Sequence, residues 1–195
     1  IEPRFPYHWF YNNHEEGAKR LCELSGITTS LAIQGPKFTF LHILLPHPPY
    51  LFRQDGTVYE DAFTMASDSW NDRNKYKEQL IFLNQQIKIV VDQILAQSSK
   101  PPIIIIQGDH GPASTVDFDH PTPQGLNERM RILNAYLLPE DGSKDLYDSI
   151  TPINSFRVIF NRYFGTSLKR ESDSSYFSSW VLPYKFLDVS TTKYT

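Results

Sequence analysis

Two neighbouring residues, Asp109 and His110, have the side chains in this sequence best suited to bind a metal ion together. A carboxylate beside an imidazole suits Zn²⁺ or Mn²⁺ rather than Mg²⁺ or Ca²⁺. Side chains alternate along a regular strand, so both can face one ion only where the strand ends and the chain turns. Gly108 and Gly111 permit such a turn. The alternative is a surface turn in which Asp109 caps the chain and His110 is exposed.

The pair follows a run of four isoleucines, Ile103–Ile106, which predicts a strand buried on both faces, as in the middle of a parallel sheet. An amphipathic helix is predicted over about 72–97, and the β-forming run 37–45 before it predicts another buried strand. Strand, helix and strand in series predict a βαβ unit over 37–112 with a right-handed crossover. The fold class is therefore α/β, with a largely parallel central sheet and flanking helices.

Further elements are predicted from local signals, and all of them fit one α/β domain or part of one over 1–195. The lead-in 1–36 is irregular except for a helix over 14–24 that Gly26 ends. The other predicted elements are a turn at Asp55-Gly56, a strand over 131–138, and a helix that Thr151-Pro152 opens and Gly165 ends.

A second strand end carries His47, within Pro46-His47-Pro48-Pro49. Ligands of open α/β sheets bind outside the carboxyl ends of the strands, so His47 is a second candidate site residue. His42, inside the predicted strand, is interpreted as a hydrogen-bonded structural residue. His120, in a loop after the Asp-His pair, is a weaker candidate for substrate contact, and Asp117 and Asp119 beside it fit a solvated loop.

The stretch Ile103 to Gly111 resembles the second metal-ligand motif of the alkaline-phosphatase superfamily, which includes sulfatases, phosphoethanolamine transferases and lipoteichoic-acid synthases. The resemblance implies that Asp109 and His110 bind a catalytic divalent metal. Residues 38–50 resemble the His-Pro segment of the family, which implies that His47 contacts the transferred phosphoryl or sulfuryl group. The tail 152–184 is similar to sulfatase-like bacterial membrane proteins of unassigned function.

The resemblance implies a metal-dependent hydrolase or transferase that acts on phosphate or sulfate esters, with His47 catalytic and His120 a further substrate contact. Two-metal members of the superfamily carry an Asp four residues before the strand-end His, where this sequence has Ile43, so a one-metal arrangement is expected. The membrane-anchored relatives imply a membrane-anchored parent protein on the extracytoplasmic face and a lipid- or envelope-linked ester as substrate.

The nucleophile of the family is expected well before the Lys37 strand, at a helix N-terminus that follows a buried strand. Thr28-Thr29-Ser30 supplies hydroxyls, but no strand is predicted before it. The chain also opens at Ile1 rather than Met, so we expect a piece of a longer protein that is inactive by itself. The alternative is a non-catalytic, degenerate module that binds a metal, an anionic glycan or a lipid headgroup.

Composition excludes several other classes. The net charge of −3, without a run of Lys or Arg, argues against a nucleic-acid-binding protein. No stretch approaches the roughly 20 apolar residues that span a bilayer. The single cysteine, Cys22, excludes an internal disulfide and a thiolate zinc cluster, and its amphipathic surroundings predict a buried thiol.

Overall fold

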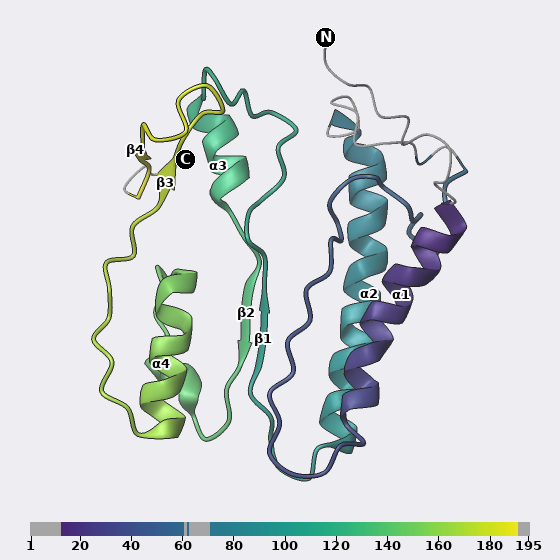
Figure 1. The fold of residues 1–195 in the computed structure, drawn as a ribbon, viewed down its shortest axis with the longest axis vertical. Helices are drawn as coiled ribbons and strands as arrows, with labels where there is room; N and C mark the ends of the chain where they lie inside the picture. The colour runs from purple at the N-terminus through teal and green to yellow at the C-terminus, as the bar shows by residue number, and fades with distance from the viewer. Residues whose placement is uncertain (1–12, 61, 63–70, 191–195) are drawn as a thin grey trace. The chain divides into compact units, whose positions relative to one another are not determined.

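The computed structural model describes residues 13–60, 62 and 71–190, and its backbone divides into two compact units, residues 1–100 and 101–195 (Figure 1). The first twelve residues of the predicted lead-in lie outside the described part. We describe each unit separately. Among the described residues, no helix combines the length and the apolar character needed to cross a membrane.

The first unit contains two helices that contact each other, α1 (Asn13–Ser30) and α2 (Arg73–Gln97). Asp72 caps α2 by accepting a hydrogen bond from the Lys75 N–H at 2.9 Å, which confirms the predicted start of this helix. α1 continues through Gly26, where we predicted its end. A glycine weakens a helix interior but does not end it unless the backbone turns left-handed, and Gly26 has no positive φ. Cys22 on α1 is exposed, so the prediction of a buried thiol is wrong.

Helices α1 and α2 enclose an apolar core with the segment that joins them. Its buried members are Leu24, Leu45, Leu51, Phe52, Tyr59, Ala62, Phe82 and Leu83. The predicted turn at Asp55-Gly56 is confirmed: Phe52 and Val58 form an antiparallel bridge, and Gly56 has φ 87°. A Cβ at Gly56 would lie 2.7 Å from the ring of Phe82, so the turn fits the core only with glycine.

Residues 37–45 form no strand, contrary to the prediction. Leu41, Ile43 and Leu45 pack toward the core, whereas Phe38 and Phe40 are each 78% exposed. In the described part of the first unit, the Phe52–Val58 bridge is the only strand pairing, so the segment has no neighbouring strand. Because side chains alternate along an extended chain, Leu41, Ile43 and Leu45 lie on one buried side without a sheet.

The second unit contains a two-stranded sheet of β1 (Ile104–Gln107) and β2 (Asn134–Leu137). The strands are antiparallel, with Ile104 opposite Leu137 and Gln107 opposite Asn134. The strand predicted over 131–138 is confirmed, but the large parallel sheet is not shown. The isoleucines of β1 are half-buried rather than buried on both faces. The combination of helices and strands agrees with the coarser α/β class.

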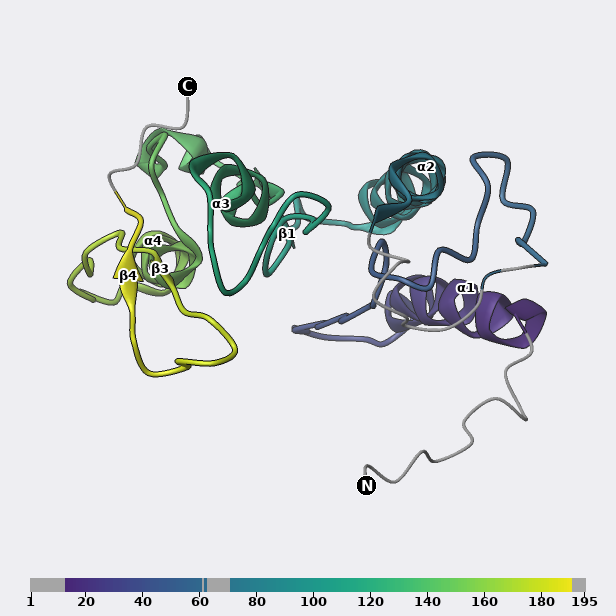
Figure 2. The ribbon, with the colours of Figure 1, turned by 90° about the horizontal axis from the view of Figure 1, so that it is seen from above.

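Three helical segments accompany this sheet: α3 (Pro123–Met130), the 3-10 helix η3 (Gly142–Asp145) and α4 (Pro152–Phe164). The predicted boundaries of α4 are confirmed, with Pro152 in the first turn and Gly165 left-handed at φ 64°. α3 was not predicted, although Thr122-Pro123 repeats the Thr-Pro signal that opens α4. A short hairpin of β3 (Tyr176–Phe177) and β4 (Leu187–Asp188) follows, and its loop projects away from α3 and α4 (Figure 2).

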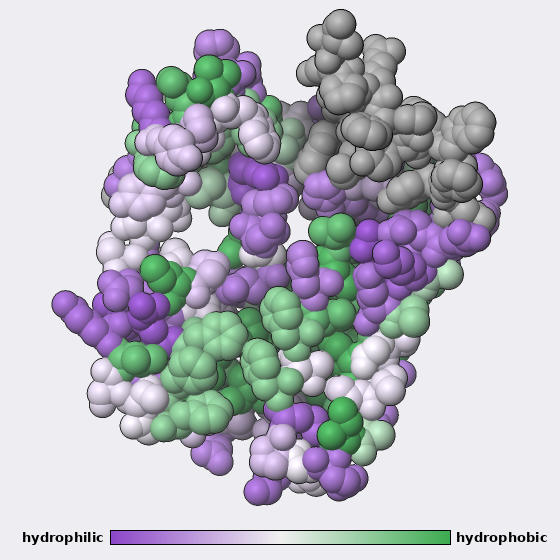
Figure 3. All heavy atoms as spheres, viewed as in Figure 1, coloured by the Kyte–Doolittle hydropathy of each residue, from purple (hydrophilic) through white to green (hydrophobic). Residues whose placement is uncertain are grey.

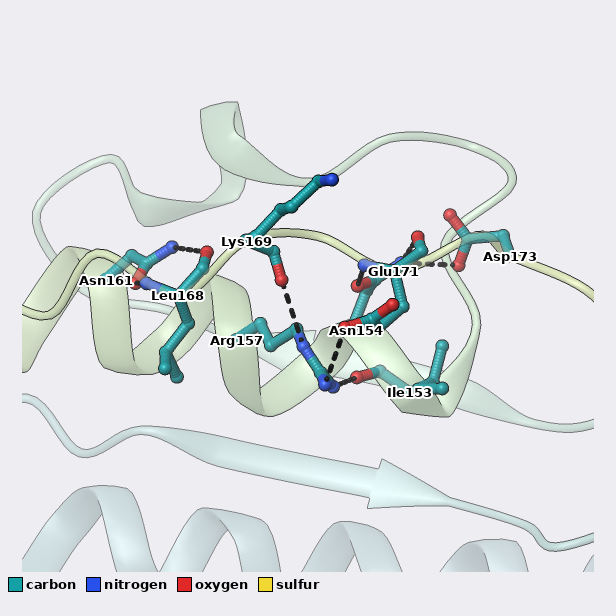
Figure 4. A network of polar contacts seen from close by, with 8 residues as sticks. All are labelled: Ile153, Asn154, Arg157, Asn161, Leu168, Lys169, Glu171 and Asp173. Carbon is teal, nitrogen blue, oxygen red and sulfur yellow. Dashed lines mark hydrogen bonds and ion pairs between the residues drawn. The ribbon is translucent and has the colours of Figure 1, made fainter.

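One side of α4 binds the backbone of residues 168–171 through side chains spaced three and four residues apart (Figure 4). Asn161 bonds both the C=O and the N–H of Leu168, and Arg157 donates to the Lys169 C=O at 3.1 Å. Asn154, fully buried, makes the same pair of bonds with Glu171, at 2.9 and 3.0 Å. We call residues 168–173 the strap. Its backbone groups obtain from α4 the partners that a neighbouring strand would otherwise supply.

Asp173 closes the strap against the start of α4. Its carboxylate accepts bonds from the Thr151 N–H at 2.8 Å, the Thr151 hydroxyl at 2.6 Å and the Tyr147 hydroxyl at 2.6 Å. Burial by itself raises the pKa of Asp173, but these hydrogen bonds to the charged form outweigh it and lower the pKa below its ordinary value of 3.8. Thr151 thus binds Asp173 instead of capping its own helix.

Replacing Asp173 by Asn should destabilise the second unit by roughly 1–3 kcal/mol at pH 7, because an amide nitrogen would face donors that now bind a carboxylate oxygen. The native carboxylate stabilises the fold fully above its unfolded pKa of about 4 and loses that contribution as the pH falls through its lower folded pKa. Urea unfolding at pH 7 and pH 3 should therefore show a smaller acid-induced loss in D173N than in the native chain. Asp148→Asn, on an exposed residue, is the control, and an equal loss in both variants would contradict the role of Asp173.

Candidate functional site

The turn after β1 lies directly against the C-terminal end of α3. Gly108 continues the ladder by donating to the Leu133 C=O at 2.9 Å, and Gly111 donates to the Arg129 C=O at 2.7 Å. A Cβ at Gly111 would lie 2.1 Å from the Glu128 carbonyl oxygen and 2.6 Å from that of Arg131. Only glycine allows this approach, which places Asp109 and His110 beside the last turn of α3.

Asp109 and His110 converge within this turn. The His110 N–H donates to Asp109 Oδ1 at 3.0 Å, so Asp109 does cap the turn as the surface-turn alternative requires. The other carboxylate oxygen, Oδ2, lies 3.5 Å from His110 Nε2. The Asp109 side chain is 83% exposed and that of His110 33%. One carboxylate oxygen thus holds the turn and the second remains beside the imidazole.

The 3.5 Å separation fits two ligands of one tetrahedral ion. With bonds of about 2.1 Å from the metal to each ligand, two corners of a tetrahedron lie roughly 3.4 Å apart. A complete site needs more ligands, and no group of three or more His, Cys, Asp or Glu side chains suitable for a metal occurs among the residues that the structure describes. The pair therefore fits half of a metal site.

Arg129 contacts the same imidazole. Its Nη1 lies 2.7 Å from His110 Nδ1 and donates to the Gly111 C=O at 3.0 Å, while Nδ1 itself lies 2.9 Å from that carbonyl. A guanidinium only donates, so a neutral His110 that accepts from Arg129 carries its proton on Nε2. Binding of a metal through Nε2 requires the proton on Nδ1, donated to Gly111. These two states exclude each other, and Arg129 must leave Nδ1 before His110 can bind a metal.

Arg129 is also the cation of a pocket of about 450 Å³ in the second unit. Burial lowers the pKa of its guanidinium, and the Asp109 carboxylate opposes this shift. The pocket is lined by charged, hydroxyl-bearing and apolar side chains. Its lining residues are Asp109, His110, Phe118, Arg129, Met130, Ile132, Ile150, Thr151, Pro152, Ser175, Tyr176, Phe177 and Ser178. Such a lining suits an anionic group attached to a larger organic group.

Glu128 holds the loop that leads from the turn to α3. Its carboxylate accepts the Ser114 and Thr115 hydroxyls and the Thr115 N–H, the last at 2.8 Å. Burial raises the pKa of Glu128, but these bonds lower it overall. A carboxylate stabilised by these hydrogen bonds holds the loop in place.

His47 lies in the first unit, half-buried in the Pro46–Pro49 turn, with Nδ1 2.5 Å from the Pro48 carbonyl oxygen. Gln79 of α2, fully buried, accepts the N–H groups of Leu51 and Phe52 at 2.7 and 3.2 Å and donates to the His47 C=O at 3.4 Å. Gln79 therefore fixes the backbone on both sides of the proline turn. We did not predict it, and its only signal was a polar residue next to the apolar stripe of the helix.

The remaining histidine candidates differ in their surroundings. His120 is exposed and is not among the described residues that line the pocket. Asp117 accepts the N–H groups of Asp119 and His120, both at 2.9 Å, and these bonds, the one from His120 first, lower its pKa. The carboxylate thus forms a turn, in line with the solvated-loop interpretation. His42 is exposed, so its interpretation as a hydrogen-bonded residue inside a strand is wrong.

The hydroxyls of Thr28-Thr29-Ser30 occupy the last turn of α1. Thr28 donates to the Ser25 C=O at 2.7 Å and Ser30 to the Ile27 C=O at 2.6 Å. A nucleophile at a helix N-terminus is favoured by the positive end of the helix dipole, whereas these hydroxyls lie at the negative end. Their placement therefore offers no activation of a nucleophile.

The sequence profile of the Sulfatase family matches residues 23–154, which is more than half of the chain. The matched range includes the His47 turn, the Asp109-His110 turn and the start of α4. The class of protein is thus a sulfatase-like hydrolase or transferase at the level of the family, and the chain belongs to the sulfatase family. No curated protein and no solved structure matches it.

The Gly111→Ala variant should lose roughly 1–3 kcal/mol of stability, because the added methyl group would overlap backbone carbonyl oxygens at the end of α3. The control is Gly26→Ala, which adds the same methyl group where no atom lies within 4 Å, in a helix that alanine favours by about 0.5–1 kcal/mol. Urea unfolding of both variants measures the difference. A neutral or stabilising Gly111→Ala would show that the turn does not need its close contact with α3.

Proposed function

We propose that this chain supplies metal-binding and substrate-contacting residues to an enzyme that cleaves or transfers phosphate or sulfate esters. The observation that carries the proposal is the 3.5 Å separation of Asp109 Oδ2 and His110 Nε2 at a pocket that also contains the Arg129 cation. Membership of the sulfatase family supports the same chemistry. The paired ligands favour a metal, and the cation favours an anionic substrate.

Asp109 and His110 would hold Zn²⁺ or Mn²⁺ as two of its ligands. When bound, such an ion stabilises negative charge on the transferred group and lowers the pKa of a hydroxyl nucleophile. Arg129, released from His110 Nδ1, can direct its N–H groups to the oxygens of a phosphate or sulfate group. Gly111 C=O then accepts the Nδ1–H of His110 and keeps Nε2 unprotonated.

His47 is proposed to hydrogen-bond a non-bridging oxygen of the ester or to protonate the leaving group. Its support is the family's His-Pro segment together with Gln79, which fixes the backbone of this turn. Ile43, in the place of an acidic ligand, supports one metal rather than two. His120 remains a proposed contact with a larger substrate.

The apolar residues that line the pocket suit a substrate with a sizeable organic group. A lipid- or envelope-linked ester and an extracytoplasmic, membrane-anchored parent protein are proposed from the resemblance to bacterial membrane enzymes, which is an argument by analogy.

A second candidate function is a module that binds a metal or an anionic headgroup without turnover. The observations that favour it are the lack of a three-ligand group in the described residues and the position of the Thr28–Ser30 hydroxyls at a helix C-terminus. Turnover of p-nitrophenyl sulfate or bis(p-nitrophenyl) phosphate, tested with this chain and with any longer product of its gene, separates the two functions.

Zinc or manganese titrated into the chain should bind with an affinity that falls at least about tenfold in Asp109→Ala and in His110→Ala, since each removes one of two paired ligands. Isothermal titration calorimetry measures the affinity. Asp119→Ala, which removes an exposed carboxylate ten residues away in the chain, is the matched control and should bind as the native chain does. Unchanged affinity in both Asp109→Ala and His110→Ala would reject the metal site.

The Arg129→Met variant should bind the metal several-fold more tightly, because it removes a cation and the hydrogen bond that keeps the proton on His110 Nε2. The same variant should bind inorganic sulfate or phosphate more weakly in the presence of the metal, because the anion loses a charged donor. Lys169→Met, which removes an exposed charge outside the pocket, should change neither affinity. Weaker metal binding in Arg129→Met would show that Arg129 supports the ligands rather than competing with the metal.

A further inference from the structure

The loop between β3 and β4 exposes a group of large apolar side chains. Trp180 is 79% exposed, Val181 71%, Leu182 52%, Tyr184 89% and Phe186 65%. We call residues 178–186 the apolar loop. It projects from its unit (Figure 2), and hydrophobic spheres reach the surface where the hairpin lies (Figure 3). A contiguous exposed set of this kind marks an interaction surface, whereas single exposed apolar residues do not.

The base of the apolar loop is fixed. Phe177 and Val189 are buried and pack with Leu126 of α3. Phe177 pairs with Leu187 in the hairpin, and Val189 donates to the Ser175 C=O at 2.9 Å. The exposed side chains therefore extend from a held hairpin rather than from a loose chain end.

We propose that the apolar loop inserts into the interfacial region of a lipid bilayer. Trp and Tyr prefer this region because their rings are apolar and their N–H or O–H groups still reach water. Lys185 is the only charged residue between Tyr176 and Leu187, so the loop carries one positive charge and no negative charge. A basic residue beside an apolar tip is complementary to anionic lipid headgroups.

The shape of the loop favours lipid over a protein partner. A projecting tip can enter a fluid interface without a matching groove, whereas a specific protein partner needs a complementary surface and paired polar groups. Leu182 donates its N–H to the Ser179 hydroxyl and Lys185 donates to the Leu182 C=O, both at 3.0 Å, and Pro183 has no N–H. These contacts order the middle of the loop, and its other backbone N–H groups need water, so an insertion of interfacial depth, short of the hydrocarbon core, follows.

This surface is independent of the metal-site proposal, but it lies next to the pocket in the chain. Ser175, Tyr176 and Phe177 line the pocket and lead directly into the apolar loop. A loop held at the lipid surface therefore keeps the pocket close to that surface.

Flotation with vesicles of phosphatidylcholine, alone or mixed with anionic phosphatidylglycerol, tests the proposal. The full chain should bind the mixed vesicles more strongly. Trp180→Ser with Val181→Ser should lower the partition coefficient by about tenfold or more, because two exposed apolar groups no longer leave water. Lys185→Glu should weaken binding to the anionic vesicles more than to the neutral ones. With Trp9 and Trp70 replaced by Phe, brominated lipid should quench Trp180.

The matched control is Ile33→Ser with Phe164→Ser, which removes two similarly exposed apolar side chains, 62% and 66%, outside the loop. It should bind vesicles as the native chain does, and circular dichroism should show native folding for all variants. The proposal is overturned if the chain binds neither vesicle, or if the control loses as much binding as the loop variant. Self-association without lipid that the loop variant abolishes would also overturn it, since the loop would then bind a second copy of the chain.

Discussion

The candidate site of the second unit depends on how closely the backbone after β1 approaches the end of α3. The last carbonyls of a helix have no hydrogen-bond donor within the helix. The Gly111 N–H donates to one of them, the C=O of Arg129. A side chain at position 111 would separate the turn from the helix. The same contact brings Arg129 against His110 and gives the imidazole two competing partners on one nitrogen. A single glycine thus links the end of a strand, the end of a helix and the position of the ring proton of His110.

The competition between Arg129 and the Gly111 carbonyl for His110 Nδ1 affects how strongly a metal ion can bind. Arg129 can satisfy the imidazole without a metal, and the Asp109 carboxylate partly opposes the lowering of the guanidinium pKa by burial. The three residues therefore form a self-sufficient polar cluster, which is less costly than an open pair of ligands beside an unpaired cation. An ion that binds here displaces the contact between Arg129 and His110. Its net affinity therefore depends on the new contacts that Arg129 makes as much as on the ligands of the ion.

Local signals predicted the parts of the fold that depend on local physics. Asp72 before α2, Thr151-Pro152 before α4 and Gly165 after it act on neighbouring residues, and the elements that they predict are present. Strand pairing depends on distant backbone, so the apolar run 37–45 could not reveal that it lacks a partner, nor Ile103–Ile106 that its partner runs antiparallel. The Asp109-His110 turn was recognisable because both residues are adjacent in sequence. The contact of Arg129 with His110 and that of Gln79 with Leu51 were not recognisable, because only folding brings these groups together.

The contact between the strap and α4 depends on residue identity in the helix more than in the strap. In α4, Asn154, Arg157 and Asn161 take part through side-chain atoms. In the strap, Leu168 and Lys169 take part through backbone atoms, which nearly every residue type offers. The contact therefore depends on the residue types of the helix and not on those of Leu168 and Lys169. Among relatives that keep this arrangement, Leu168 and Lys169 should be free to vary while the three positions of α4 are restricted. These two residues would look dispensable in a comparison of sequences although the fold relies on the path of their backbone.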